Sequence, residues 1–132
     1  MNKIHAALAI ACLSASMLAG CARTSAIYNV NEAPVATASG KAMSAAQVRS
    51  AIMTAGAALG WRFADAGPGK LEGTLNIRAH QAVVLVPYTA KTYSIVYKSS
   101  QNLNEANGSI HSNYNGWVQN LDNAIRAEMS RS

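Results

Sequence analysis

The fold is decided by residues 82–97, which read AVVLVPYTAKTYSIVY. The first half is apolar at both odd and even positions, whereas Tyr93, Ile95 and Tyr97 alternate with smaller or more polar residues. A four-residue loop over residues 89–92 would set Tyr88 opposite Tyr93, and every large residue of the set would then share one side. A three-residue loop would scatter them over both sides. The pattern therefore predicts an antiparallel hairpin with one richly apolar face.

The flanking sequence predicts the rest of the domain. Residues 45–59 have helical apolar spacing, and Ser44 and Gln47 before them have the form of a capping box. Residues 61–64 and 71–79 alternate as strands, and a second helix, capped by Ser112 or Asn113, carries an apolar stripe of Tyr114, Trp117, Val118, Leu121 and Ile125. We expect an α+β, two-layer fold in the order α-β-β-β-β-α. Its four-stranded antiparallel meander would carry the N-terminal and C-terminal helices on one face.

The N-terminus predicts where the protein is located. Met1-Asn2-Lys3 is positively charged, Ile4 to Leu18 is an apolar run shorter than a membrane span, and Leu18-Ala19-Gly20-Cys21 follows. This last stretch resembles the lipobox of bacterial lipoproteins, in which the cysteine sulfur receives a diacylglyceryl group before the preceding peptide is removed. The resemblance implies that the mature chain begins at lipidated Cys21.

These features predict three parts in the chain: a signal peptide at 1–20, the lipidated cysteine and a flexible tether at 21–41, and a globular α+β domain at 42–132. Residues 22–41 show no apolar period and could reach roughly 65 Å when extended. Ala22 is not the aspartate associated with inner-membrane retention, so the resemblance implies an outer-membrane anchor with the domain facing the periplasm. No other segment approaches a transmembrane length.

The C-terminal part of the sequence resembles a group of short proteobacterial outer-membrane lipoproteins over Ser44 to Arg131. The resemblance is carried by Arg78-Ala79-His80, Val84, Tyr88, Tyr93-Ser94-Ile95-Val96-Tyr97, Ile110-His111, Tyr114-Asn115, Trp117-Val118 and Leu121. It implies fold and location, and it brings no functional residue with it.

Charge and residue inventory exclude several function classes. The chain has 11 basic and 6 acidic residues, and loss of Lys3 with the signal would leave a net charge near +4. The cations are spread singly and the expected compartment holds no nucleic acid, so we expect none as a partner. Removal of Cys12 and acylation of Cys21 would leave no free thiol. Neither His80 nor His111 belongs to a spaced ligand pair, so we expect no enzyme, metal or cofactor.

Two surfaces are candidates for function. In the predicted register, Val83, Leu85 and Pro87 lie beside Val96 on the outer side of the sheet, an apolar strip that could bind an envelope protein or a second copy of the chain. The alternative is a small binding module for a glycan, peptide or lipid, built from the loop before the second helix; its candidate residues are Asn102, Asn104, His111, Tyr114 and Asn115. These polar groups could equally satisfy loop backbone and a helix cap.

Overall fold

The computed structural model describes residues 23–132, so the expected signal peptide and Cys21 lie outside the described residues. The fold is α+β. Its helices are α1 (Ala45–Ala58) and α2 (Ser112–Ser130). Its strands are β1 (Thr24–Ala26), β2 (Val30–Pro34), β3 (Trp61–Asp65), β4 (Lys70–Ile77), β5 (His80–Pro87), β6 (Thr92–Gln101) and β7 (Ser109–His111).

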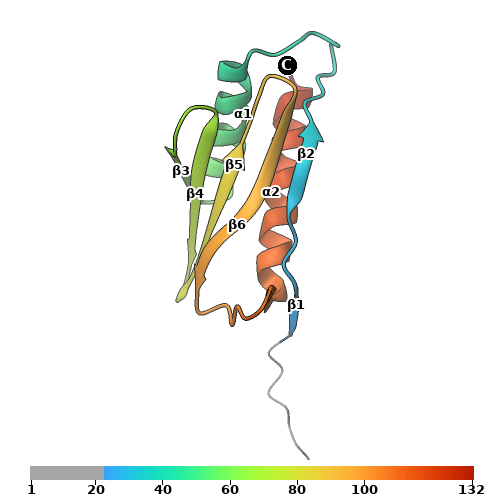
Figure 1. Cartoon of the computed structure of the whole chain (residues 1–132). Helices are drawn as coiled ribbons and strands as arrows, with labels where there is room; N and C mark the ends of the chain where they lie inside the picture. Colours follow the sequence, from blue (N-terminus) through green and yellow to red (C-terminus); the bar gives the residue numbers. More distant parts are fainter. Residues whose placement is uncertain (1–22) are drawn as a thin grey trace, which may run out of the picture.

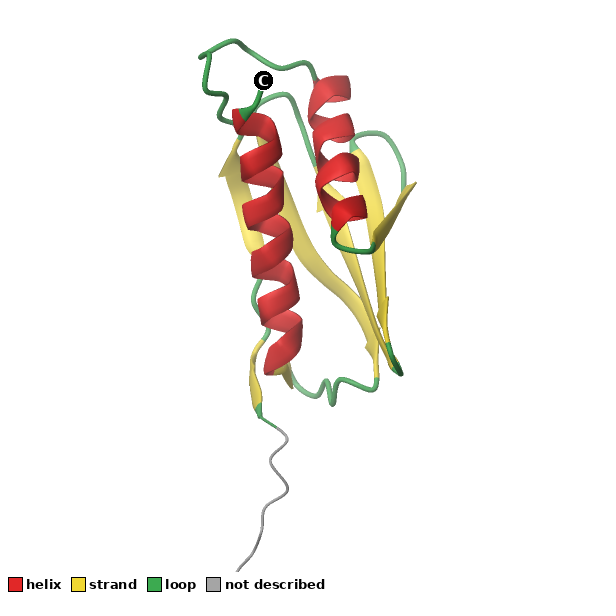
Figure 2. Ribbon diagram, turned by 180° about the vertical axis from the view of Figure 1, so that it is seen from behind, coloured by secondary structure: helices red, strands yellow, loops and turns green. Residues whose placement is uncertain are grey.

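Five of the strands form one antiparallel sheet in the order β2-β6-β5-β4-β3, and β1 pairs with β7 in a separate two-stranded sheet. Both helices lie on the same side of the larger sheet, which they cover in Figure 2. The opposite side of the sheet faces the viewer in Figure 1. The expected four-stranded sheet and the order α-β-β-β-β-α are therefore wrong. The structure has three further strands, β1 and β2 before α1 and β7 directly before α2.

The hairpin of β5 and β6 has the predicted register. Tyr88 lies opposite Tyr93 and Val84 opposite Tyr97. The register shifts by one residue beyond Val84, where Val83 pairs with Ser99, so a bulge falls at Lys98. The large residues of the hairpin consequently share the face that the helices cover.

Residues 23–41, the described part of the expected flexible tether, contain two strands of the fold. Strand β2 pairs with β6 at the sheet edge, and its Val30 and Ala33 are buried in the core. These two core residues are three positions apart in sequence, whereas neighbours on one face of a regular strand are two apart. The pairing register shifts between them, and Glu32 there has a left-handed backbone conformation. A bulge of this kind removes the alternation by which a strand is recognised in sequence.

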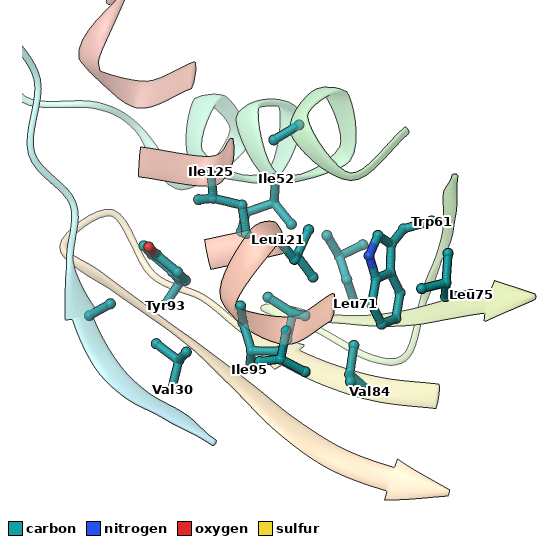
Figure 3. Packing of buried hydrophobic residues seen from close by; sticks show 14 of the residues in the cluster. Val30, Ile52, Trp61, Leu71, Leu75, Val84, Tyr93, Ile95, Leu121 and Ile125 are labelled. Carbon is teal, nitrogen blue, oxygen red and sulfur yellow. The ribbon is translucent and has the colours of Figure 1, made fainter. Parts of the chain in front are cut away.

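The core lies between the sheet and the helices (Figure 3). Helix α1 begins with the predicted capping box, in which Ser44 accepts from the Gln47 amide and the Gln47 side chain accepts from the Ser44 amide. The predicted stripe of α2 is buried at Tyr114, Val118, Leu121 and Ile125, while Trp117 is only half-buried. The cap of α2 is His111 rather than Ser112 or Asn113.

The Phe63 ring of β3 occupies a slot between two glycines, Gly56 of α1 and Gly73 of β4. Gly73 is the direct cross-strand partner of Phe63, and a Cβ atom on it would lie 2.7 Å from the ring. A Cβ atom on Gly56 would overlap the same ring. Glycine in a helix or strand interior is normally destabilising, so here the missing side chains are explained by the space that the ring requires.

Replacing glycine by alanine should have opposite effects on stability in the two helices, because only Gly56 borders the Phe63 ring. Gly116→Ala in α2 meets nothing within 4 Å, so it should raise the free energy of unfolding by about 0.5–1 kcal/mol through helix propensity. Gly56→Ala should instead lower it by about 1–3 kcal/mol, because overpacking outweighs that gain. Urea unfolding of the two variants measures the difference. A stabilised Gly56→Ala protein would show that the ring moves freely.

Candidate functional site

The sheet face opposite the helices is the first candidate site. Leu85 of β5 faces Val96 of β6 on one side and Glu72 of β4 on the other, so these three side chains form a row across the open face. Leu85, Pro87 and Val96 are half-buried, whereas Val83 is only 7 % exposed although it lies outside the main core cluster. The predicted strip is therefore present on this face, although Val83 itself is almost fully buried.

An ion pair crosses the open face. Lys98 Nζ of β6 lies 2.8 Å from Glu72 Oε2 of β4, and the strand between these two is β5. The aliphatic part of Lys98 therefore spans the central strand at the level of the strip. The pair covers part of the apolar surface and places one charge of each sign beside it. Both side chains are substantially exposed, so the pair contributes little to stability.

The loop before α2 is joined to the rest of the fold through Asn102. Asn102 Nδ2 donates to the Ala79 carbonyl at 2.6 Å, and His80 Nδ1 donates to the Asn102 carbonyl at 2.7 Å. Asn102, Asn104 and Asn107 all have left-handed backbone conformations, which asparagine tolerates better than most residues. These asparagines therefore shape the loop, and Asn102 joins it to the β4–β5 turn.

His111 and Asn115 hold the start of the described chain against α2. His111 Nδ1 accepts from the Asn113 amide as the helix cap, and the His111 backbone pairs with Thr24 of β1. Asn115 Nδ2 donates to the Ala26 carbonyl and to Ser25 Oγ, while Asn115 Oδ1 accepts from the Tyr28 amide. The sequence predicted both residues as candidates for ligand binding; the structure places them in contact with residues 24–28.

A buried carboxylate lies between β6 and α2. Tyr93 Oη donates to Asp122 Oδ1 at 2.5 Å, and Arg126 Nε donates to Asp122 Oδ2 at 3.0 Å. Asp122 is the one buried charged side chain among the described residues. Burial, followed by the bond to Asp122, raises the pKa of the Tyr93 hydroxyl well above its usual range. In sequence, Asp122 and Arg126 have the four-residue spacing of an ordinary ion pair on an exposed helix face, and nothing there indicates the tyrosine.

Tyr114 differs from Tyr93 in that none of the described residues bonds its hydroxyl. The side chain is fully buried, its ring meets Tyr97 edge to face at 5.5 Å, and its Oη has no hydrogen-bond partner among the described residues. Burial raises the pKa of this hydroxyl as well. Among the predicted ligand residues, Tyr114 is thus part of the core and is not accessible.

A groove that the sequence did not indicate lies at the opposite end of the helices. It has a volume of about 620 Å³ and is lined by the β2–α1 connection, the exposed face of α1 and the C-terminal end of α2, including Lys41, Met43, Gln47, Ser50, Glu128 and Ser132. Ser39 Oγ donates to the Ser132 carbonyl at 3.2 Å and so closes one end of the groove. Its α1 residues are alanines and polar residues, which form no recognisable pattern in sequence.

Further properties of residues 23–132 bear on function. Within this part of the chain, no three histidine, cysteine or acidic side chains lie close enough together to hold a metal ion. None of its helices is long and apolar enough to cross a bilayer. Comparison of the chain with family models, curated proteins and solved structures gives no significant match.

The two buried tyrosines predict a matched pair of variants. Tyr93→Phe removes the donor to a buried carboxylate and should lower the free energy of unfolding by about 1–3 kcal/mol. Tyr114→Phe removes a hydroxyl that bonds to none of the described residues, so it should leave stability unchanged or raise it. Urea unfolding at pH 7 tests both. Equal losses in the two variants would contradict the assigned hydrogen bond.

The same two tyrosines should make the stability of the fold fall at high pH. A tyrosine whose pKa is higher in the folded than in the unfolded state stabilises the protein below the unfolded pKa of about 10 and loses this contribution as pH rises beyond it. Stability should therefore decline above that pH. Absorbance titration should show two of the five tyrosines ionising only as the protein unfolds; ionisation of all five before unfolding would contradict this.

Proposed function

We propose that this protein is a non-enzymatic outer-membrane lipoprotein, anchored through Cys21, whose periplasmic domain contacts other envelope proteins through the open face of its sheet. The observation that carries the proposal is that the two helices cover one sheet face only, while the other bears half-buried Leu85, Pro87 and Val96. Apolar residues gathered on an uncovered face are typical of protein contact surfaces.

The residues around this strip suit a protein partner. The Lys98–Glu72 pair supplies one charge of each sign next to the apolar row, as in the polar rim of an interface. A second copy of the chain is the simplest such partner, since a symmetric dimer would set the same strip against itself. On the alternative surface, by contrast, Asn102 and Asn115 use their side-chain amides to hold the β4–β5 turn and β1.

The alternative function is a small periplasmic binding module for a glycan, peptide or lipid. The groove of about 620 Å³ beside α1 supports it, because its volume lies in the range of small-ligand sites. Lys41 and Glu128 would supply opposite charges to such a ligand, and Met43 an apolar contact. In this alternative the ligand would bind in the groove beside α1 and not at the region from Asn102 to Asn115.

The anchor is tested by Cys21→Ala in the full-length chain. The variant should lose its acyl groups and leave the membrane fraction, because one residue provides the whole attachment. Mass spectrometry of the unaltered protein should show an acylated N-terminal Cys21. A Cys21→Ala protein that still fractionates with the outer membrane would show that the anchor is elsewhere.

The contact surface is tested by Leu85→Lys combined with Val96→Glu. These residues face each other, so the pair adds charge to the strip without setting like charges opposite one another. Gln119→Lys with Asn120→Glu makes the same charge change on an exposed part of α2 and is the control. A photocrosslinker at Pro87 in cells should give a discrete protein adduct that the strip variant loses and the control keeps.

Two results would contradict the proposal. If the folded strip variant retains the adduct, the strip is only surface. If the strip variant unfolds while the control does not, Leu85 and Val96 belong to the stability of the sheet and are not free to bind a partner.

A further inference from the structure

Three segments that are distant in sequence meet at one end of the domain. Ser112 N donates to the Arg23 carbonyl and Ile27 N to the Gly108 carbonyl, which ties the β1 segment to the loop before α2. Asn102 joins the same loop to the β4–β5 turn at Ala79. Figure 1 shows this end, from which the chain leads toward its N-terminus, opposite the end that carries the C-terminus. We call it the anchor end: residues 23–26, 78–80 and 102–108.

The anchor end begins almost immediately after the expected lipidation site. Only Ala22 separates Cys21 from Arg23, whose carbonyl is already bonded to α2. Two residue steps span at most about 7 Å. The ten residues of β6 run the length of the sheet, which places the far end of the domain about 30 Å away. A lipid on Cys21 would therefore leave the domain no freedom to stand clear of the headgroups.

The chemistry of the anchor end suits a phospholipid surface. Arg23 and Arg78 are exposed there, and Arg78 lies in the β4–β5 turn with a positive φ that points to a tight, fixed turn. Glu105 is the one acid of the three segments. The remaining exposed residues are mostly Thr, Ser, Ala, Asn and Gly, which contact headgroups without requiring a pocket. Cations near an anionic leaflet are attracted to it.

We propose that the domain docks directly on the phospholipid headgroups of the membrane through the anchor end, with its long axis pointing away from the bilayer. The groove beside α1 then lies at the distal end, which is the end of the domain farthest from the membrane. The inference rests on the lipid anchor of the proposed function and adds the orientation and the lipid surface as a partner. The hydrogen bonds of Asn115 and the β1–β7 pairing carry it, because they fix the start of the chain to the domain.

The test compares alanines at the two ends. The full-length, natively lipidated protein carries p-benzoylphenylalanine at Ala79 or Ala106 of the anchor end, or at Ala38 of the distal end, all exposed. Each protein is reconstituted in vesicles of phosphatidylethanolamine and phosphatidylglycerol that contain a radiolabelled phospholipid, and is then irradiated. Flotation with the vesicles reports the anchor separately from the orientation.

We expect Ala79 and Ala106 to label with phospholipid several-fold more than Ala38. A Gly-Ser insertion of about 20 residues between Ala22 and Arg23, with an average span of about 25 Å, should abolish the difference while flotation persists. Equal labelling at both ends, or none at either, in a protein that floats would overturn the orientation and leave the anchor standing. A protein that does not float would overturn both.

Discussion

The register of the β5–β6 hairpin is the constraint on which the rest of the structure depends. It places Tyr93, Ile95, Val84 and Val86 on one face, where the two helices bury them, and Leu85 and Val96 on the other. A slip of one residue would reverse both sets. The covered core and the uncovered strip are thus consequences of one pairing. The bulge at Lys98 comes only after the large residues have been placed.

Prediction from the sequence succeeded where burial imposes a period. Helix α1 with its Ser44–Gln47 cap and the β5–β6 register were predicted correctly. In both elements the spacing of apolar residues follows directly from which side chains face the core. The prediction failed for β1, whose three residues are all exposed, and for β2, whose bulge at Glu32 places Val30 and Ala33 out of phase. Both strands are held by backbone pairing, and β1 is held also by Asn115, whose partner Ser25 is 90 residues away. A local pattern cannot show such contacts.

The candidate sites were predicted only in part for a related reason. The strip followed from strand parity, but the burial of Val83 and the Lys98–Glu72 pair above it depend on three strands together. Asn102, His111 and Tyr114 have the residue types of a binding loop, yet their side chains serve a turn, a cap and the core. The groove beside α1 is lined by residues of both helices and the β2–α1 connection, which no local pattern brings together. Residue type indicates what a side chain can bond, whereas the fold decides which partner it has.

The pairing of the first strands with the last ones has a consequence for synthesis. Strand β2 needs β6, and β1 needs β7 and Asn115, so neither can be completed until the chain has been made nearly to its end. Non-local pairing of this kind delays closure of the sheet. A growing chain would hold Val30 and Ala33 without their partners, and the domain would reach its final form only after the last third had emerged. If the chain is exported as proposed, this delay would keep it unfolded while it crosses the membrane.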